Sequence, residues 1–249
     1  MQMHALRLRP LRKIHTNKSA EPYGDARRGF LSVGRGTITG MAKPDVVTAE
    51  QWELARSELL TAEKEATRSL DALAARRRRL PMVRFAGDYT FAAPSGPRTL
   101  LDLFEGREQL AVYQFMDNGP GHFCPGCTAF TNNVPSHALV MLGQRGISWA
   151  TVSNMPLAQI EPYRAVRGWT MPFVSSHGTT FADDCGAGGG FMLSMFLRDG
   201  DEVYRTYSTT ARGVDRLLFT NNLADLSVFG RQEDWEDSPP GWPQHPTYG

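Results

Sequence analysis

The sequence has few cysteines, no long apolar run and no excess of either charge. Its 249 residues include three cysteines, too few for a disulfide scaffold. No uninterrupted apolar run approaches the roughly 20 residues that a membrane-spanning helix needs. With 27 Lys and Arg against 26 Asp and Glu, the net charge of +1 gives the whole molecule no electrostatic reason to bind nucleic acid. No nucleotide-binding motif appears. We therefore expect a soluble protein with no membrane, nucleic-acid or cofactor partner.

The first 40 residues differ from the rest of the chain. They carry eight basic residues against two acidic ones and show no helical or strand periodicity. We expect residues 1–43 to form a disordered basic tail. Alternatively, the natural start is Met41 and the upstream residues come from an over-long gene assignment. A third interpretation is a twin-arginine export signal at Arg27-Arg28-Gly29-Phe30-Leu31, but glycines and charges follow it where an apolar segment is needed. We expect a cytoplasmic protein.

Residues 44–81 are predicted to form an N-terminal amphipathic helix. Thr48 suits the N-cap, with Gln51 as its capping-box partner. The helix is predicted to run to about Arg79 and to end before Pro81. Apolar side chains recur at helical spacing at Trp52, Ala55, Leu59, Ala62, Ala66, Leu70 and Leu73.

Residues 82–230 alternate between strand and helix patterns. Apolar runs predict strands at 109–116, 147–153 and 172–176, with helical patterns after the first two. An Asp-Gly turn between runs 191–197 and 202–208 predicts a hairpin. Runs 83–91 and 99–103 predict a small hairpin or an entry strand. Strands joined through helices must be parallel, whereas hairpin strands are antiparallel. The pattern predicts a mixed α/β sheet flanked by helices, followed by a C-terminal surface tail at 231–249.

The tetrapeptide Cys124-Pro125-Gly126-Cys127 follows the first core strand, an arrangement that resembles the thioredoxin fold. Pro125 suits the first position of a helix, which makes Cys124 the N-cap and puts Cys127 in the first turn. The N–H groups of Gly126 and Cys127 then favour a thiolate at Cys124. Cys127 is placed to resolve a mixed disulfide.

Other interpretations of the two cysteines stay open at this point. They are two inert buried thiols, or half of a zinc site completed by two further ligands. Candidates for the missing ligands are His122, His137, His177 and Cys185. A peroxiredoxin-like interpretation rests on the pattern Pro120-x-x-x-Cys124-x-x-Cys127. Peroxiredoxins carry a proline, then a Thr or Ser, then the peroxide-reactive cysteine. In this pattern Cys124 stands in the Thr or Ser position, and Cys127 is the peroxide-reactive residue.

Two distant residues are candidates for a supporting role. Arg212 follows the hairpin of residues 191–208 and is our candidate for stabilising the Cys124 thiolate, with an exposed surface arginine as the alternative. Cys185 is a possible third redox thiol or a bystander.

Several stretches together resemble the bacterial family called domain of unknown function 899. The resemblance covers about residues 46–245. It is carried by Val47 to Trp52, Leu80-Pro81-Met82-Val83, Asp102-Leu103-Phe104, the Cys-x-x-Cys motif, Trp169 with Pro172 to Ser176, Tyr207 to Asp215, and Phe229-Gly230-Arg231. It implies a thioredoxin-like fold and a dithiol-disulfide oxidoreductase, without naming a substrate. One departure from thioredoxins is Gly188-Gly189-Gly190, which stands where they place a cis-proline.

The leading hypothesis is a dithiol-disulfide oxidoreductase that cycles Cys124 and Cys127. Its expected partners are a disulfide-bearing protein or small thiol substrate and a protein reductant. The alternatives are a thiol peroxidase that uses Cys127, and a non-enzymatic metal-binding or copper-delivery protein that uses both cysteines and a histidine such as His122.

Overall fold

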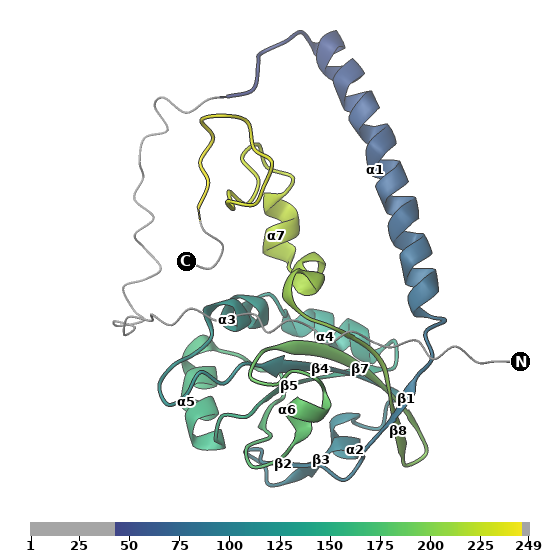
Figure 1. Cartoon of the computed structure of the whole chain (residues 1–249), viewed down its shortest axis with the longest axis vertical. Coiled ribbons are helices and arrows are strands. Elements are labelled where there is room, and N and C mark those ends of the chain that lie inside the picture. Colours follow the sequence, from purple (N-terminus) through teal and green to yellow (C-terminus); the bar gives the residue numbers. More distant parts are fainter. Residues whose placement is uncertain (1–42, 246–249) are drawn as a thin grey trace, which may run out of the picture. The chain divides into compact units, whose positions relative to one another are not determined.

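A six-stranded mixed sheet lies at the centre of the structure, a computed structural model that describes residues 43–245 (Figure 1). Its strand order is β1-β8-β7-β4-β5-β6, and β2 and β3 form a separate two-stranded sheet. The strands are β1 (Val83–Phe85), β2 (Thr90–Phe91), β3 (Arg98–Thr99), β4 (Gln109–Phe115), β5 (Ile147–Ser153), β6 (Phe173–Ser175), β7 (Met192–Asp199) and β8 (Glu202–Thr209).

Helices follow β4 and β5 as predicted, and the structure adds the short helices α2 and α6. The helices are α1 (Ala49–Arg77), α2 (Leu100–Leu103), α3 (Pro125–Asn132), α4 (Ser136–Gly143), α5 (Leu157–Arg167), α6 (Phe181–Asp184), the 3₁₀ helix η1 (Ala211–Leu217) and α7 (Phe219–Ala224). Strands β4, β5 and β6 run parallel, whereas β7 pairs antiparallel with β4 and forms a hairpin with β8. A parallel strand–helix–strand unit followed by an antiparallel hairpin confirms the predicted thioredoxin-like mixed sheet with an N-terminal helix.

The central strand β4 separates two apolar cores. Its side chains alternate between the faces of the sheet. Leu110 and Val112 join one core, which also contains residues of α2 and α6. Tyr113 and Phe115 join the other, which contains residues of α3, α5 and η1. Figure 1 shows α3 on the side of the sheet opposite α2. Because both faces of β4 are covered, its sequence is almost continuously apolar.

Two predicted helix boundaries are confirmed by their hydrogen bonds. Thr48 caps α1, and Gln51 completes the capping box. Pro135 interrupts the helical pattern after the cysteines, so that α3 ends at Asn132 and α4 begins at Ser136. The apolar stripe of α1 stays largely exposed: Trp52 retains 55% of its accessible surface, and no residue of α1 is buried.

The small hairpin predicted from 83–91 and 99–103 is confirmed only in part: β2 pairs antiparallel with β3, whereas β1 pairs with β8. The predicted strand does not continue over residues 100–103. Leu100–Leu103 forms the short helix α2 because Thr99 and Asp102 make a reciprocal capping box at its start. Leu100 and Leu103 are buried in the first core. The capping signal therefore outweighs the β preference of the adjoining residues.

The ends of the chain are described only in part. The predicted basic tail, the alternative start at Met41 and the export signal lie outside the described residues, apart from the exposed Lys43. At the other end, segment 231–245 lies at the surface and is held by ion pairs of Arg231 and by the ring contact between Phe229 and Trp242. Within residues 43–245, no helix is both long and apolar enough to cross a bilayer. The domain boundaries stay predictions.

Removal of the Phe181 ring should destabilise the fold strongly. Phe181 is fully buried and makes edge-to-face contacts with Phe85, Tyr89 and Phe91 at centroid distances of 5.9, 5.1 and 4.9 Å. Phe181→Ala should lower the free energy of unfolding by about 3–5 kcal/mol in urea titrations. Phe219→Ala is the control, because Phe219 is 70% exposed. Equal losses in the two variants would contradict this assignment of the core.

Candidate dithiol site

Cys124 lies where β4 ends and α3 begins. The intervening loop is closed by a bridge between Asp117 and Phe123. Inside the loop, Gly119 has φ of +93°, a conformation that favours glycine, and its N–H donates to the Asp117 carboxylate at 2.9 Å. The Gln159 side chain, from α5, donates to the Gly119 carbonyl at 3.0 Å. These bonds fix the approach of the chain to Cys124.

The Cys124 sulfur caps helix α3. The Cys127 N–H donates to Cys124 Sγ with an N···S distance of 3.1 Å, and the Cys124 backbone has extended dihedral angles. Pro125 occupies the first helical turn, where its missing N–H leaves no broken bond. The predicted positions of both cysteines at a helix start are confirmed. Both thiols are free in the structure.

The two thiols have opposite pKa shifts. The pKa of Cys124 is lowered to about 7, mainly because its sulfur accepts a hydrogen bond from the Cys127 thiol, with further bonds from the N–H groups of Cys127 and Gly126. Burial opposes this shift. The pKa of Cys127 is raised by the same thiol–thiol bond, by burial and by the negative charge on Cys124. Near neutral pH Cys124 therefore changes from thiol to thiolate, while Cys127 stays protonated.

Two hydrogen-bond donors lower the pKa of Cys127. The Met116 N–H and the Tyr113 hydroxyl both donate to its sulfur and favour its thiolate form. Tyr113 is 1% exposed, and its ring stacks on Phe130 at a centroid distance of 4.1 Å. The hydroxyl is therefore held rigidly beneath the helix that carries both cysteines.

Aromatic side chains also surround the outer thiol. Phe123, directly before Cys124, stacks on Tyr163 at 3.5 Å. The Tyr163 hydroxyl lies 2.8 Å from the Thr128 hydroxyl on α3. Cys124 keeps 8% of its surface accessible, whereas Cys127 keeps none. A reagent from solvent can therefore reach Cys124 first.

The structure does not bring Arg212 to the thiols. Its guanidinium lies over the Trp235 ring at 3.5 Å and pairs with Asp215 at 3.4 Å. The causes that lower the pKa of Cys124 are local to the start of α3. The proposed thiolate-stabilising role of Arg212 is thus replaced by hydrogen bonds from the motif itself.

Cys185 also lies apart from the pair. It belongs to the core on the opposite face of the sheet, where burial raises its pKa to about 12. Pro120 is exposed in the loop before Cys124. Across residues 43–245, no group of three or more His, Cys, Asp or Glu side chains is arranged to hold a metal ion, so the structure does not gather His122, His137 or His177 around the cysteines.

Sequence reasoning missed Tyr113, Met116 and Gln159. Tyr113 sits in an apolar run and reads as an ordinary core residue. Its alternation with Val112 does place it on the face opposite the first core, but only the packed structure puts its hydroxyl at the Cys127 sulfur. Met116 acts through its backbone, which carries no side-chain signal, and Gln159 comes from a helix more than 30 residues away.

The family described as "Bacterial protein of unknown function (DUF899)" matches residues 41–248. The chain belongs to this family. No curated protein sequence matches the DUF899 chain.

Similar solved structures include the peroxidoxin BcpB of Mycobacterium tuberculosis, with TM-score 0.42, 18% identity, and coverage of 57% of this chain and 95% of that one. A thiol:disulfide interchange protein from Bacteroides sp. has TM-score 0.40 and 14% identity, with coverage of 61% and 95%. A secreted disulfide oxidoreductase of M. tuberculosis has TM-score 0.35 and 12% identity, with coverage of 52% and 91%.

Alkylation should distinguish the thiols by pH. Because the pKa of Cys124 is lowered to about 7, its thiolate is present above that pH and is lost as the pH falls below it. Peptide mapping after iodoacetamide pulses should give a half-maximal rate for Cys124 near pH 7, well below the roughly 8.5 of an ordinary thiol. Cys127 and Cys185 should stay unlabelled in that range. Cys185→Ala is the control and should leave the profile unchanged; a Cys124 midpoint at or above about 8.5 would contradict the capping argument.

Proposed function

We propose that this protein is a dithiol-disulfide oxidoreductase in which Cys124 attacks and Cys127 resolves. The observation that carries the proposal is the unequal pair at the start of α3. The Cys124 thiol has a pKa lowered to about 7, in a residue that keeps 8% of its surface accessible, whereas the pKa of the fully buried Cys127 thiol is raised. This arrangement supplies one nucleophile and keeps its partner protonated until needed.

In the first step the Cys124 thiolate attacks one sulfur of a substrate disulfide. A new bond forms between Cys124 and that sulfur, the substrate S–S bond breaks, and the second substrate sulfur leaves as a thiolate that takes a proton from water. The helix-start N–H groups of Gly126 and Cys127 hold the attacking sulfur in place. No other oxidant or reductant enters this step.

In the second step Cys127 attacks the Cys124 sulfur. Once Cys124 is in a mixed disulfide, it no longer carries negative charge, so two of the three causes that raise the pKa of Cys127 weaken or disappear. The Tyr113 hydroxyl and the Met116 N–H remain to stabilise the Cys127 thiolate. The Cys124–Cys127 disulfide forms, and the released substrate sulfur takes up a proton. The substrate disulfide has been reduced by two electrons, and the protein dithiol oxidised by two.

The pair then needs reduction by another dithiol. With no nucleotide-binding motif in the sequence, we assign this role to a protein reductant. The substrate is a disulfide-bearing protein or a small disulfide, and we place the reaction in the cytoplasm. Gly188-Gly189-Gly190 precedes β7 where thioredoxins carry a cis-proline, and no cis peptide bond occurs within the described residues. The absence of side chains there allows a substrate backbone to come close to the site.

The geometry favours the oxidoreductase over the alternatives. A peroxidase that uses Cys127 needs that residue to be the accessible thiolate. Cys127 has no accessible surface, and its pKa is raised rather than lowered. No contact in the described part of the chain supports a copper-delivery role specifically.

Single cysteine variants test the assignment of roles. With an aromatic disulfide such as dithionitrobenzoate, the wild-type protein should release two equivalents of thionitrobenzoate, the first from attack by Cys124 and the second from resolution by Cys127. Cys124→Ser should release neither at neutral pH. Cys127→Ser should release only the first and retain a mixed disulfide, detectable by mass spectrometry. Cys185→Ala is the control and should behave as wild type. Fast release from Cys124→Ser, or rapid sulfenic acid formation at Cys127 with one equivalent of peroxide, would overturn the proposal.

Tyr113→Phe tests the resolving step separately. The change removes only the hydroxyl that donates to the Cys127 sulfur. Because a hydrogen bond to a charged group contributes about 1.5–3 kcal/mol, release of the second thionitrobenzoate should slow by roughly tenfold or more. The first release should keep its rate and its pH profile. Tyr163→Phe is the matched control, since its hydroxyl contacts Thr128 and neither cysteine. Unchanged resolution in Tyr113→Phe would remove Tyr113 from the mechanism.

A further inference from the structure

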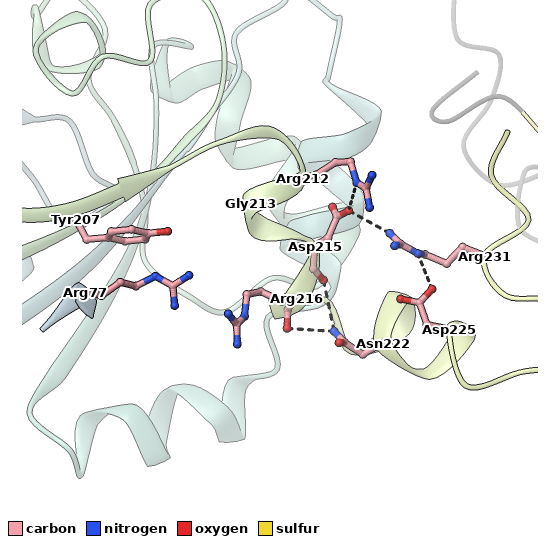
Figure 2. Close-up of a pocket in the computed structure, with 9 residues that line it drawn as sticks. All are labelled: Arg77, Tyr207, Arg212, Gly213, Asp215, Arg216, Asn222, Asp225 and Arg231. Atoms are coloured by element: carbon pink, nitrogen blue, oxygen red, sulfur yellow. Dashed lines mark hydrogen bonds and ion pairs between the residues drawn. The ribbon is translucent and has the colours of Figure 1, made fainter. Parts of the chain in front are cut away.

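Four arginines line a cavity of about 320 Å³ that the dithiol mechanism does not use (Figure 2). The lining comes from the end of α1, from β8, from η1, and from α7 with the segment that follows it. The cavity is formed by Arg77, Tyr207, Arg212, Gly213, Asp215, Arg216, Asn222, Asp225 and Arg231. Arginine carries its charge at every accessible pH, so this cavity has four fixed positive charges against two carboxylates.

Two of the arginines are neutralised by the aspartates. Arg231 keeps only 10% of its side chain exposed and pairs with Asp215 at 3.1 Å and with Asp225 at 2.7 Å. Arg212 pairs with Asp215 and lies over Trp235. Figure 2 shows these pairs along one wall of the cavity. These ion pairs form one wall of the cavity, and they engage both of its carboxylates.

The other two arginines have no acidic partner. Among residues 43–245, no carboxylate lies within ion-pair distance of Arg77 or Arg216. Arg77 lies over the Tyr207 ring at 5.4 Å, which holds its guanidinium at the cavity. In Figure 2 the guanidinium groups of Arg77 and Arg216 point toward each other, beside the Tyr207 hydroxyl. Two facing cations repel each other, and an anion between them would turn that repulsion into two attractive interactions.

We propose that this cavity binds the phosphate group of a small phosphorylated molecule. A guanidinium presents paired N–H donors that match phosphate oxygens, and two of them with a neighbouring hydroxyl suit a dianion with several oxygens. The volume is at the lower end of small-molecule sites, enough for a phosphate with a compact organic group. A nucleic acid is disfavoured because the chain as a whole carries a net charge of only +1.

The site is separate from the dithiol. On its inner side η1 contributes Val214 to the core that contains Cys124 and Cys127, whereas Arg212, Gly213, Asp215 and Arg216 of the same helix line the cavity. No thiol takes part in binding. The proposal therefore stands or falls independently of the redox chemistry.

Calorimetric titration of the full chain tests the proposal with inorganic phosphate and with ribose 5-phosphate at constant ionic strength. Both should bind saturably with one site per chain, and ribose without phosphate should not bind. Arg77→Gln and Arg216→Gln should each weaken phosphate binding at least tenfold. Both ligands should raise the melting temperature of the wild-type protein, and the tighter ligand should raise it more at equal concentration. Cys124→Ser should bind them as the wild type does.

Arg145→Gln is the matched control. Arg145 is exposed on the chain after α4 and lies outside the cavity. An equal loss of affinity in this variant would reduce the effect to general surface charge and overturn the proposal. Absence of saturable binding at millimolar phosphate would also overturn it. Tighter binding of a short single-stranded oligonucleotide than of ribose 5-phosphate would overturn the small-molecule assignment.

Discussion

The hydrogen bond from the Cys127 N–H to the Cys124 sulfur is the interaction on which the site depends. It caps α3, and it fixes the two thiols next to each other in the first turn of that helix. The cap requires β4 to end at a fixed point, because the closed loop of residues 117–123 must deliver Cys124 in an extended conformation. The position of β4 depends in turn on the apolar cores on both of its faces. Packing and thiol chemistry are therefore coupled through a single backbone N–H.

The environment of the pair divides its two roles physically. A helix start lowers the pKa of a thiol, and an apolar interior raises it. Cys124 receives the donors of the helix start and keeps slight access to solvent, whereas Cys127 lies wholly in the interior. Tyr113 and Met116 supply donors to the buried sulfur, so that it can ionise once the outer thiolate has reacted. In the order that we propose, Cys124 attacks and Cys127 resolves because Cys127 is buried more deeply than Cys124.

The 3₁₀ helix η1 connects two chemically different parts of the protein. Val214 packs into the core that contains the cysteines, while its neighbours Asp215 and Arg216 face the arginine-lined cavity. The stretch from Tyr207 to Asp215, one of those that carry the family resemblance, therefore contributes to packing and to the cavity. It does not contribute a charge to the thiolate. Arg212 is part of the cavity wall because Asp215 and Trp235 lie beside it.

The sequence by itself determined the features that depend on neighbours along the chain. Thr48 with Gln51, Pro135, and the Cys124-Pro125 helix start act within a few residues, and β4 is visible as an apolar run. One local signal was overlooked. Thr99 and Asp102 form a capping box that starts helix α2, where a strand was predicted. Tertiary structure alone decided the positions of Arg212 and Cys185, because ion pairs and the faces of a sheet bring together residues far apart in sequence. It also placed the Tyr113 hydroxyl at Cys127, since only packing across the sheet–helix interface sets that contact.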